Sequence, residues 1–402
     1  MNVVFISPYF PTYFYNFCDR LKQRGVHVLG IGDEIYDYLS QETKSSLTEY
    51  YRVDSLENYD EVYRACGYFI SKYGKIDWIE SENEYWLELE ATLRSDFNVN
   101  TGTKIEHMSP MKYKSKMKKV YQEANIPVAR YRLLHRYEDA IEFTNEVGYP
   151  IVVKPDNGVG ASKTYKLNNQ DELHYFLSTK DDVLYIMEEF VNGHVETFDG
   201  ITDADKHILI CSSHVMLHSI MDTVNDKSDM AFFSQSVEKN DIREIGERVV
   251  KAFDTRSRFF HFEFFRLDVD KEGLGQKGDL IGLEVNMRAP GAYMPDMINY
   301  TYDEDVYTIW ADMLIYNQCF TVPQRKYFVG YASRRHGIDY VYSHDEIIAM
   351  MKDELLLEAE IAPVLSDAMG NHTYLFRTAD RYHLEEWIRM ILKREDGTQW
   401  FK

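Results

Sequence analysis

The stretch Glu284-Val285-Asn286-Met287-Arg288 carries most of the information in this 402-residue sequence. On a β-strand successive side chains point to opposite faces, so Glu284, Asn286 and Arg288 share one face while Val285 and Met287 face a core. Carboxylate and amide oxygens are the ligands that Mg²⁺ prefers, and a guanidinium beside them suits a phosphate or a developing oxyanion. We therefore interpret this stretch as part of a site for a cation and an anion.

A second acidic strand lies upstream in His261-Phe262-Glu263-Phe264-Phe265, where one carboxylate interrupts an aromatic run. A hairpin that sets Asp270 opposite Lys277 places Glu263 directly opposite Glu284. Two carboxylates in these positions repel each other unless a cation bridges them. The alternative is an exposed sheet face with both charges in water. We favour a metal site because the flanking residues are apolar.

The loop Asp156–Ser162 follows the apolar strand Ile151–Lys154. Its glycines would let backbone N–H groups approach a phosphate, but they also fit an ordinary hairpin turn. Lys154 favours the phosphate, because a lysine at the end of an apolar strand requires a counter-anion. The candidate loop contacts are Gly158, Gly160, Ala161 and Ser162.

A third candidate segment is Glu188-Glu189-Phe190-Val191, which ends an apolar strand and precedes Glu196. It is either a strand end that reaches solvent or, together with Lys154, part of a nucleotide site. In the second case backbone groups of Glu189 and Val191 would bond an adenine edge, and a carboxylate would take the ribose hydroxyls.

Basic residues are dense in one place, a predicted helix that runs to about residue 123. One interpretation is that these basic residues form a solvated helix face. We favour an anion site, because the chain as a whole carries a formal charge of −21. The lysines concerned are Lys104, Lys112, Lys114, Lys116, Lys118 and Lys119.

The composition excludes several partners. With 66 acidic and 45 basic residues, the surface repels nucleic acid and anionic membranes. No stretch approaches the roughly 20 apolar residues of a membrane helix, the N-terminus lacks the features of a signal peptide, and the four cysteines have no metal or redox spacing. We expect a soluble cytoplasmic protein that acts on small molecules.

The order of predicted elements indicates two kinds of sheet. Strands and helices alternate over the first hundred residues, which predicts an α/β domain with a parallel sheet. The glycine fingerprint of a dinucleotide site is missing, because Ser7-Pro8-Tyr9-Phe10-Pro11 follows the first strand. After Pro150 strands dominate, which predicts a mostly antiparallel α+β body.

In this order along the chain, the segments resemble the ATP-grasp superfamily, in particular its carbamoyl-phosphate-synthetase-like and L-amino-acid-ligase-like members. The resemblance implies that Lys114 and Lys154 hold phosphates of ATP and that the loop at 158–162 closes over them. It also implies that Glu188 meets the adenine amino group and that Glu196 is the acid beside the ribose.

The same resemblance implies the metal ligands and the catalytic groups. Glu263, Glu284 and Asn286 match the ligands of Mg²⁺, for which Mn²⁺ is a substitute. Arg288 matches the active-site arginine, and with Lys154 it would act on the transferring phosphoryl group.

The resemblance covers about residues 1 to 335 and implies a domain organisation. We expect a Rossmann-like domain at 1–107, a small ATP-grasp lobe at 108–190, a large lobe with the metal site at 191–325 and a C-terminal extension at 326–402. Two departures are a longer hairpin between Glu263 and Glu284 and fewer glycines in the loop than in biotin carboxylase.

The implied reaction is ligation of a small carboxylate, an amino acid, to an amine or thiol through an acyl phosphate, with release of ADP and phosphate. The alternatives are an ATP-grasp carboxylase and a non-catalytic nucleotide-binding sensor. A homodimer is compatible with this fold. Arg334 and Arg335 are candidates for binding the substrate carboxylate, and a surface strand end is the competing interpretation.

Overall fold

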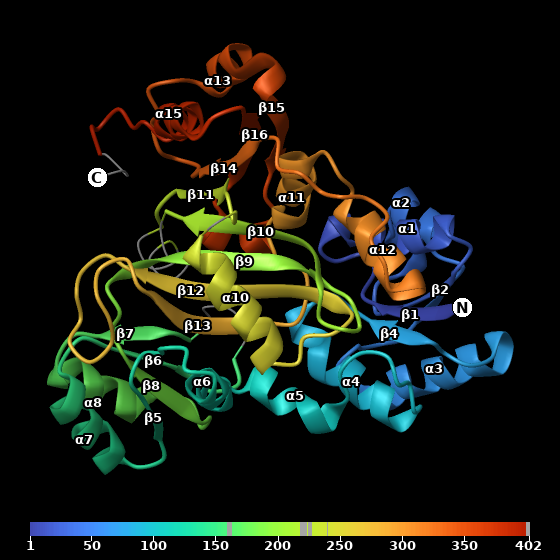
Figure 1. Cartoon of the computed structure of the whole chain (residues 1–402), viewed down its shortest axis with the longest axis horizontal. Helices are drawn as coiled ribbons and strands as arrows, with labels where there is room; N and C mark the ends of the chain where they lie inside the picture. Colours follow the sequence, from blue (N-terminus) through green and yellow to red (C-terminus); the bar gives the residue numbers. More distant parts are fainter. Residues whose placement is uncertain (159–162, 218–222, 224–226, 239, 399–402) are drawn as a thin grey trace.

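Three β-sheets organise the chain in the computed structural model, which describes residues 1–158, 163–217, 223, 227–238 and 240–398. The first sheet, in blue in Figure 1, is parallel with the order β3-β2-β1-β4. Its strands are β1 (Asn2–Ile6), β2 (His27–Gly32), β3 (Glu49–Arg52) and β4 (Trp78–Glu80). The helices beside it are α1 (Tyr15–Gln23), α2 (Gln41–Ser46), α3 (Tyr59–Tyr73) and α4 (Leu87–Asp96).

Two short helices, α5 (Ile105–Lys112) and α6 (Lys114–Glu123), lead to a small antiparallel sheet. The sequence predicts one continuous helix here, but the chain breaks at Tyr113, whose backbone is extended. The break lets the Lys114 N–H donate to the Asp156 carbonyl at 2.9 Å. The sheet has the order β5-β8-β6-β7. Its elements are β5 (Tyr131–Leu134), α7 (Tyr137–Val147), β6 (Ile151–Pro155), β7 (Tyr165–Leu167), α8 (Gln170–Thr179) and β8 (Tyr185–Glu189).

The large sheet is antiparallel with the order β13-β12-β9-β10-β11-β14-β16-β15. Its strands are β9 (Gly193–Thr202), β10 (Ile208–Met216), β11 (Met230–Gln235), β12 (Arg258–Leu267), β13 (Leu280–Asn286), β14 (Phe328–Arg334), β15 (Leu355–Glu360) and β16 (His372–Thr378). The helices around it are α10 (Asp241–Ala252), α11 (Met294–Tyr302), α12 (Val306–Tyr316), α13 (His344–Met351), α14 (Pro363–Met369) and α15 (Arg381–Ile391). None of the helices in the described ranges is both long and apolar enough to cross a membrane.

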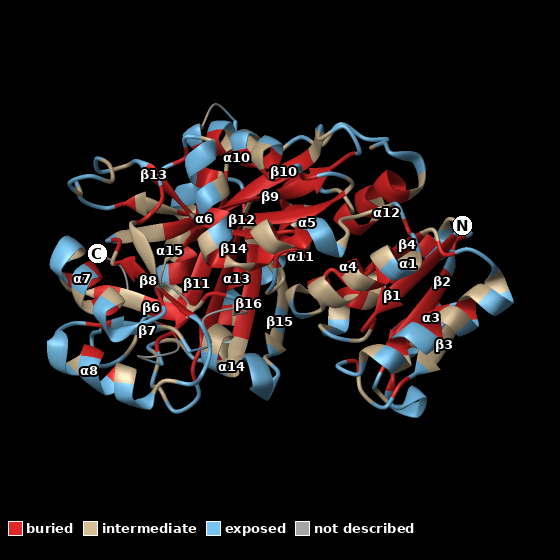
Figure 2. Cartoon of the chain, turned by 90° about the horizontal axis from the view of Figure 1, so that it is seen from below, coloured by how far each residue is buried: buried red, intermediate tan, exposed pale blue. Residues whose placement is uncertain are grey.

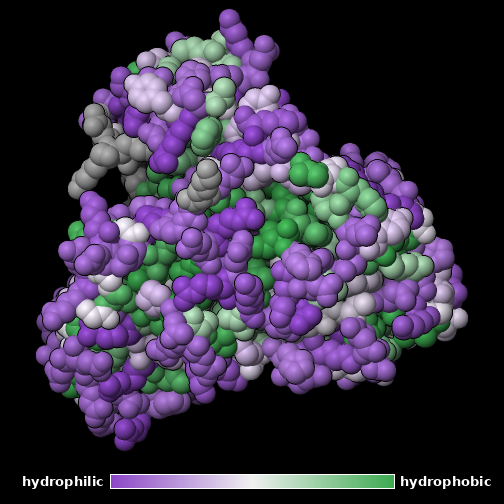
Figure 3. Space-filling model, in the orientation of Figure 1, coloured by the Kyte–Doolittle hydropathy of each residue, from purple (hydrophilic) through white to green (hydrophobic). Residues whose placement is uncertain are grey.

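The strands form the buried interior of the molecule, while the helices expose their outer faces (Figure 2). One core crosses from the first sheet to the large sheet. Phe17 of α1 lies 4.9 Å from Trp310 of α12 and 6.4 Å from Phe259 of β12, measured between ring centroids. The face drawn in Figure 3 shows a hydrophobic patch near its centre, surrounded by hydrophilic side chains. The contacts of Phe17 with Trp310 and Phe259 thus join the first sheet to the large sheet in one continuous apolar cluster.

The register of the β12–β13 hairpin places Glu263 opposite Glu284, as the sequence predicts. The prediction assumed an uninterrupted ladder, whereas the structure has a register shift between Glu263 and Phe264. Nearer the turn, Phe264 pairs with Gly282. A bulge next to a pair of acidic side chains changes the direction in which they project.

Candidate active site

The polar residues of β13 lie on one face of the sheet. Because His261 pairs with Asn286 and Glu263 with Glu284, all four side chains share that face. Val285 and Met287 are fully buried in the core on the other side, as the alternation predicts. Two carboxylates and an amide therefore converge, which is a donor set that suits Mg²⁺.

The charge balance around these carboxylates favours a cation. Burial raises the pKa of Glu284; Lys114, whose Nζ lies 3.3 Å from its Oε1, opposes this, while Glu84 and Glu263 reinforce it. Burial likewise opposes the ionisation of Glu263, but a hydrogen bond with His261 at 3.0 Å keeps its pKa below the ordinary value. A bound divalent ion would lower the cost of holding both groups ionised.

Arg288 extends this site toward the first sheet. Its Nη2 donates to Glu84 Oε2 at 2.9 Å, and its Nη1 donates to the Ala289 carbonyl at 2.9 Å. Burial opposes the charge of the guanidinium, but Glu84 raises its pKa, so Arg288 stays cationic. A guanidinium has five N–H donors, so donors remain for an anionic ligand.

Three lysines converge from two elements beside the carboxylates. Lys114 and Lys118 lie four residues apart on α6 and are buried, and Lys114 Nζ donates to the Gly158 carbonyl at 2.8 Å. Lys118 and Lys154 both contact the Glu188 carboxylate, with N–O distances of 3.2 and 3.1 Å. The predicted anion site on this helix is therefore built from its inward-facing lysines, while Lys116 and Lys119 are exposed.

Glu188 is held in its ionised form between two of these lysines. Burial opposes ionisation, but Lys118 and Lys154 lower the pKa of Glu188 to about 2. Its buried Oε1 makes no hydrogen bond within the described part of the chain, and neither does Lys118 Nζ. The ion pairs compensate these buried charges, and a ligand could supply the hydrogen bonds that the two atoms do not make.

The two residues after Glu188 both contact basic side chains. The Glu189 carboxylate binds the Arg130 guanidinium, with a shortest N–O distance of 2.7 Å, and the Glu189 N–H donates to the Arg130 carbonyl at 3.0 Å. The Phe190 ring lies 4.0 Å from Lys166 Nζ. The contacts of the Glu189 side chain with Arg130 therefore fix the position of the local backbone. Backbone groups of this segment are the ones predicted to bond adenine.

Glu196, the predicted ribose-side acid, lies near the start of β9. It pairs with Phe264, whereas Glu263 pairs with Thr197, so Glu196 and Glu263 lie on opposite faces of the sheet. Its carboxylate binds Arg266 through two hydrogen bonds of 2.7 and 2.8 Å. The assignment of Glu196 to the ribose stays a prediction.

The structure describes only part of the predicted phosphate-binding loop. Gly158 is described, and its carbonyl accepts the Lys114 hydrogen bond at 2.8 Å. Gly160, Ala161 and Ser162 lie outside the described residues, so their predicted contact with phosphate stays a prediction.

A buried polar chain beside the carboxylates was missed in the sequence. Asp199 contacts His261 Nδ1 at 2.5 Å and His214 Nδ1 at 2.8 Å, and His261 Nε2 contacts Glu263 Oε1 at 3.0 Å. Burial lowers the pKa of His261, but Asp199 outweighs it and raises that pKa to about 9. A charged His261 orients the Glu263 carboxylate. The available signal was the polar pair Thr197 and Asp199, two residues apart in an apolar strand.

Arg334 and Arg335 have structural contacts with backbone carbonyls. Both are buried, which rules out the surface strand end. Arg334 Nε donates to the Ile391 carbonyl at 2.7 Å, and Arg335 donates to backbone carbonyls including Ser228 at 2.8 Å and Ser366 at 2.6 Å. These contacts hold the C-terminal elements together, so we do not assign either side chain to a substrate.

Glu82 makes the stability of the chain dependent on pH. Burial and the nearby Glu80 raise its pKa to about 8, so the folded chain keeps Glu82 protonated at a pH where the unfolded chain ionises it. The free energy of unfolding is therefore expected to fall as the pH rises from about 4.5 to about 8, by up to about 1.4 kcal/mol per pH unit for one proton. Urea unfolding at pH 5, 6, 7 and 8 measures this slope.

Glu82→Gln is the matched variant for that experiment. Both Glu82 oxygens accept hydrogen bonds, from Trp310 Nε1 at 2.6 Å and from the Ala289 N–H at 2.7 Å, so the amide adds a cost that does not vary with pH. The variant should have a shallower slope than the wild type. Equal slopes in both proteins would contradict a protonated Glu82.

The family comparison gives one match within the chain. Residues 111–259 match the family model described as "ATP-grasp domain". This range contains the three lysines and Glu188 and ends within β12.

Two curated relatives match parts of the chain. The L-arginine-specific L-amino acid ligase of Bacillus subtilis is 26% identical over 274 residues, which cover 66% of this chain and 64% of that protein. The carbamoyl phosphate synthase large chain of Thermotoga neapolitana is 30% identical over 118 residues, which cover 28% of this chain and 11% of that protein. The chain therefore spans less than two thirds of the length of either relative.

The solved structures extend the likeness to the whole chain. The L-amino acid ligase from Bacillus licheniformis matches with a TM-score of 0.72 at 14% identity, covering 98% of this chain and 97% of that one. At this identity the match establishes the mixed α/β fold.

Proposed function

We propose that this chain is an ATP-dependent carboxylate–amine ligase, because residues 111–259 match the ATP-grasp family model. It would activate a small carboxylate, an amino acid, as an acyl phosphate and release ADP and phosphate. The observation that carries the proposal is the facing pair Glu263 and Glu284 beside Lys114, with Arg288 on the same strand end. The curated L-amino acid ligase that matches 66% of the chain supports an amino acid as the carboxylate.

The lysines would bind the phosphates of ATP. Lys114 and Lys154 are already held by carboxylates, Glu284 and Glu188, so little side-chain entropy is lost when an anion binds. Lys118 is buried with no hydrogen bond from its Nζ among the described residues, and a phosphate oxygen would supply one. Glu188, ionised and acceptor-only, would accept from the adenine amino group.

The carboxylates and the amide would hold Mg²⁺, which neutralises phosphate charge when bound. Glu263, Glu284 and Asn286 supply its oxygen ligands, and His261 keeps Glu263 oriented through their 3.0 Å contact. Arg288, anchored by Glu84, would stabilise the negative charge that develops on the transferring phosphoryl group or the tetrahedral intermediate. The loop at 158–162 would exclude water from the acyl phosphate.

A nucleotide-release assay tests this proposal. The purified protein is incubated with Mg-ATP and with single amino acids, with pairs and with bicarbonate, and the products are identified. ADP and phosphate that form only with a particular pair support the ligase, and hydroxylamine should trap the acyl phosphate as a hydroxamate. ADP formation that needs bicarbonate would replace the proposal by a carboxylase. AMP and pyrophosphate, or nucleotide binding without turnover, would overturn it.

We propose small-molecule substrates and a cytoplasmic location, and the acidic composition disfavours nucleic acid as a partner. A homodimer is compatible with this fold, and light scattering would distinguish it from a monomer.

Lys154→Gln is expected to raise the KM for ATP by about 10- to 100-fold, because a charge-assisted hydrogen bond contributes about 1.5–3 kcal/mol. Its effect on kcat should be smaller, since the contact is made in both the bound and the transition state. Steady-state ADP release at varied ATP measures both constants. Lys326→Gln is the control, because the exposed Lys326 pairs with Asp303 outside the site. An unchanged KM in Lys154→Gln would contradict the assignment.

A further inference from the structure

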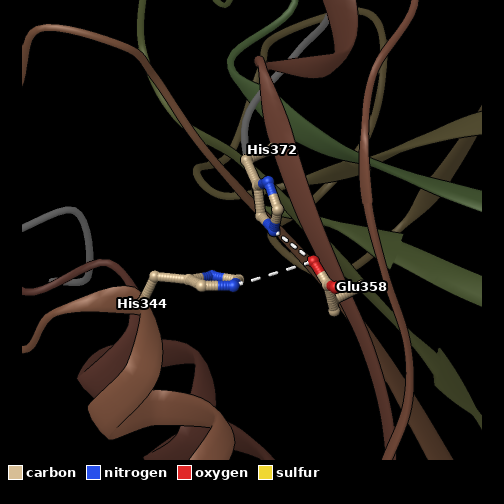
Figure 4. A group of neighbouring side chains, drawn as sticks. All are labelled: His344, Glu358 and His372. Carbon is tan, nitrogen blue, oxygen red and sulfur yellow. Dashed lines mark ion pairs between the residues drawn. The ribbon is translucent and has the colours of Figure 1, made fainter.

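Three potential metal ligands converge in the C-terminal part of the chain, outside the proposed nucleotide site. They are His344 at the start of α13, Glu358 on β15 and His372 on β16, and Figure 4 shows both imidazoles directed at one carboxylate. Glu358 Oε2 lies 2.8 Å from His372 Nε2 and 3.8 Å from His344 Nε2. The ligand atoms of all three residues lie within 4.8 Å of one another.

The sheet register explains why the two strand residues meet. Glu360 pairs with His372 and Glu358 pairs with Tyr374, so these four side chains lie on one face. His344 is brought over this face by α13, and its ring centroid lies 4.6 Å from that of His372. The convergence is therefore fixed by regular elements and does not depend on loops.

The outer nitrogen of each histidine is already engaged. His344 Nδ1 contacts the Tyr374 hydroxyl at 2.8 Å, and His372 Nδ1 contacts Glu360 Oε1 at 3.1 Å. The Glu360 carboxylate can accept the N–H of His372 Nδ1, and in that tautomer Nε2 would present a lone pair to an ion placed between it and Glu358. A carboxylate or another oxygen on the far nitrogen is the arrangement that orients metal-bound histidines.

We propose that His344, Glu358 and His372 bind one divalent transition-metal ion of the Zn²⁺ type, with at least one position left for water or an anionic ligand. Two imidazole nitrogens favour such an ion over Mg²⁺ or Ca²⁺, which prefer oxygen ligands. Tetrahedral coordination at about 2.0–2.1 Å sets the ligand atoms about 3.3 Å apart. The observed 2.8 and 3.8 Å lie on either side of that value.

Binding would link α13 to β15 and β16. Glu358 and His344 are partly exposed, so the ion can enter from solvent. Because the ion contacts three separate elements, it would stabilise the folded C-terminal part by an amount that rises with the logarithm of its free concentration over its Kd. The other described group with ligand spacing, Asp203, Asp205 and His207, lies within one turn, so we assign no ion to it and use it as a control.

Titration of the chelator-treated full chain with Zn²⁺, and in parallel with Co²⁺, tests the proposal without nucleotide. We expect one tight site per chain and a tetrahedral Co²⁺ absorption band without thiolate charge transfer, which separates this site from the half-buried Cys319. His372→Ala and His344→Ala should each weaken binding by about 100-fold or more, and Tyr374→Phe by about 10-fold, as for loss of an outer contact. His207→Ala should bind as the wild type does.

Thermal unfolding keeps the test independent of folding defects. In EDTA the His344→Ala and wild-type proteins should unfold at similar temperatures, and only the wild type should gain stability with Zn²⁺. Absence of a tight site in the wild type, or equal affinity in His344→Ala and the wild type, would overturn the proposal. Because no nucleotide is present, a failure here leaves the proposed ligase function unaffected.

Discussion

Glu284→Gln is expected to lower kcat for ATP-dependent ligation by about 1,000-fold, because the amide keeps the size of the side chain but removes the charge that holds the cation. Glu284 faces Glu263 and lies 3.3 Å from Lys114, so the variant loses an ion pair as well as a ligand. ADP release at saturating Mg-ATP and amino acids measures kcat. The Mg²⁺ concentration that gives half-maximal turnover should rise as well.

Glu272→Gln is the matched control for this variant, because Glu272 is exposed in the same hairpin. It should retain wild-type turnover. The fold of Glu284→Gln should survive, since burial already raises the pKa of Glu284 and its neutral form is therefore tolerated. Turnover of Glu284→Gln within about threefold of the wild type would contradict the metal-site assignment.

Arg258→Leu is expected to destabilise the chain by about 3–5 kcal/mol, because it leaves buried carboxylates without one of their two cations. Arg258 Nη2 lies 3.3 Å from Glu90 and 3.6 Å from Glu80, and Arg94 is the second cation of this network. Arg258 Nε also donates to the Met287 carbonyl at 2.9 Å. Denaturant unfolding at pH 7 measures the loss.

Arg256→Leu serves as the control, because it removes the same residue type two positions away. Arg256 is exposed and pairs with Asp254, so its loss should be far smaller than that of Arg258→Leu. If the two variants lost equal stability, the buried network would not be what Arg258 supports.

The parts of the site that lie on regular strands were predictable from the sequence. Alternation alone placed Val285 and Met287 in the core and Glu284 with Asn286 on the other face. The pair Glu263 and Glu284 was predicted from a register assumed at the turn, but next to the turn that register does not hold, since Arg266 pairs with Leu280. One extra residue of β13, Leu283, restores the predicted pair, and the adjacent Gly282 was the unused signal for this bulge.

Other parts of the site depend on contacts between elements distant in the sequence. The face of β9 on which Glu196 lies could not be read from chain order. Glu84 was missed because its partner Arg288 is 204 residues away. Lys118 was visible only as one of six lysines, and its position one helical turn after Lys114 was the unused signal.

The C-terminal part of the fold was the least predictable. The strand β15 leaves little signal in the sequence, because its central residues are only half buried. The helices α11 and α12 were also missed, although α12 is apolar on nearly every side. The three proposed metal ligands come from three elements and have no recognisable motif spacing, so tertiary structure alone brings them together.

The apolar cluster that joins the first sheet to the large sheet limits how this protein can be recombined. Phe5 and Phe17 share a core with Phe259 and Trp310, and Arg24 is ion-paired with Asp312. A chimaera that exchanges only residues 1–107 with a homologue would replace half of this core and leave α12 facing foreign side chains. Such an exchange therefore requires α12 to be exchanged together with the N-terminal segment.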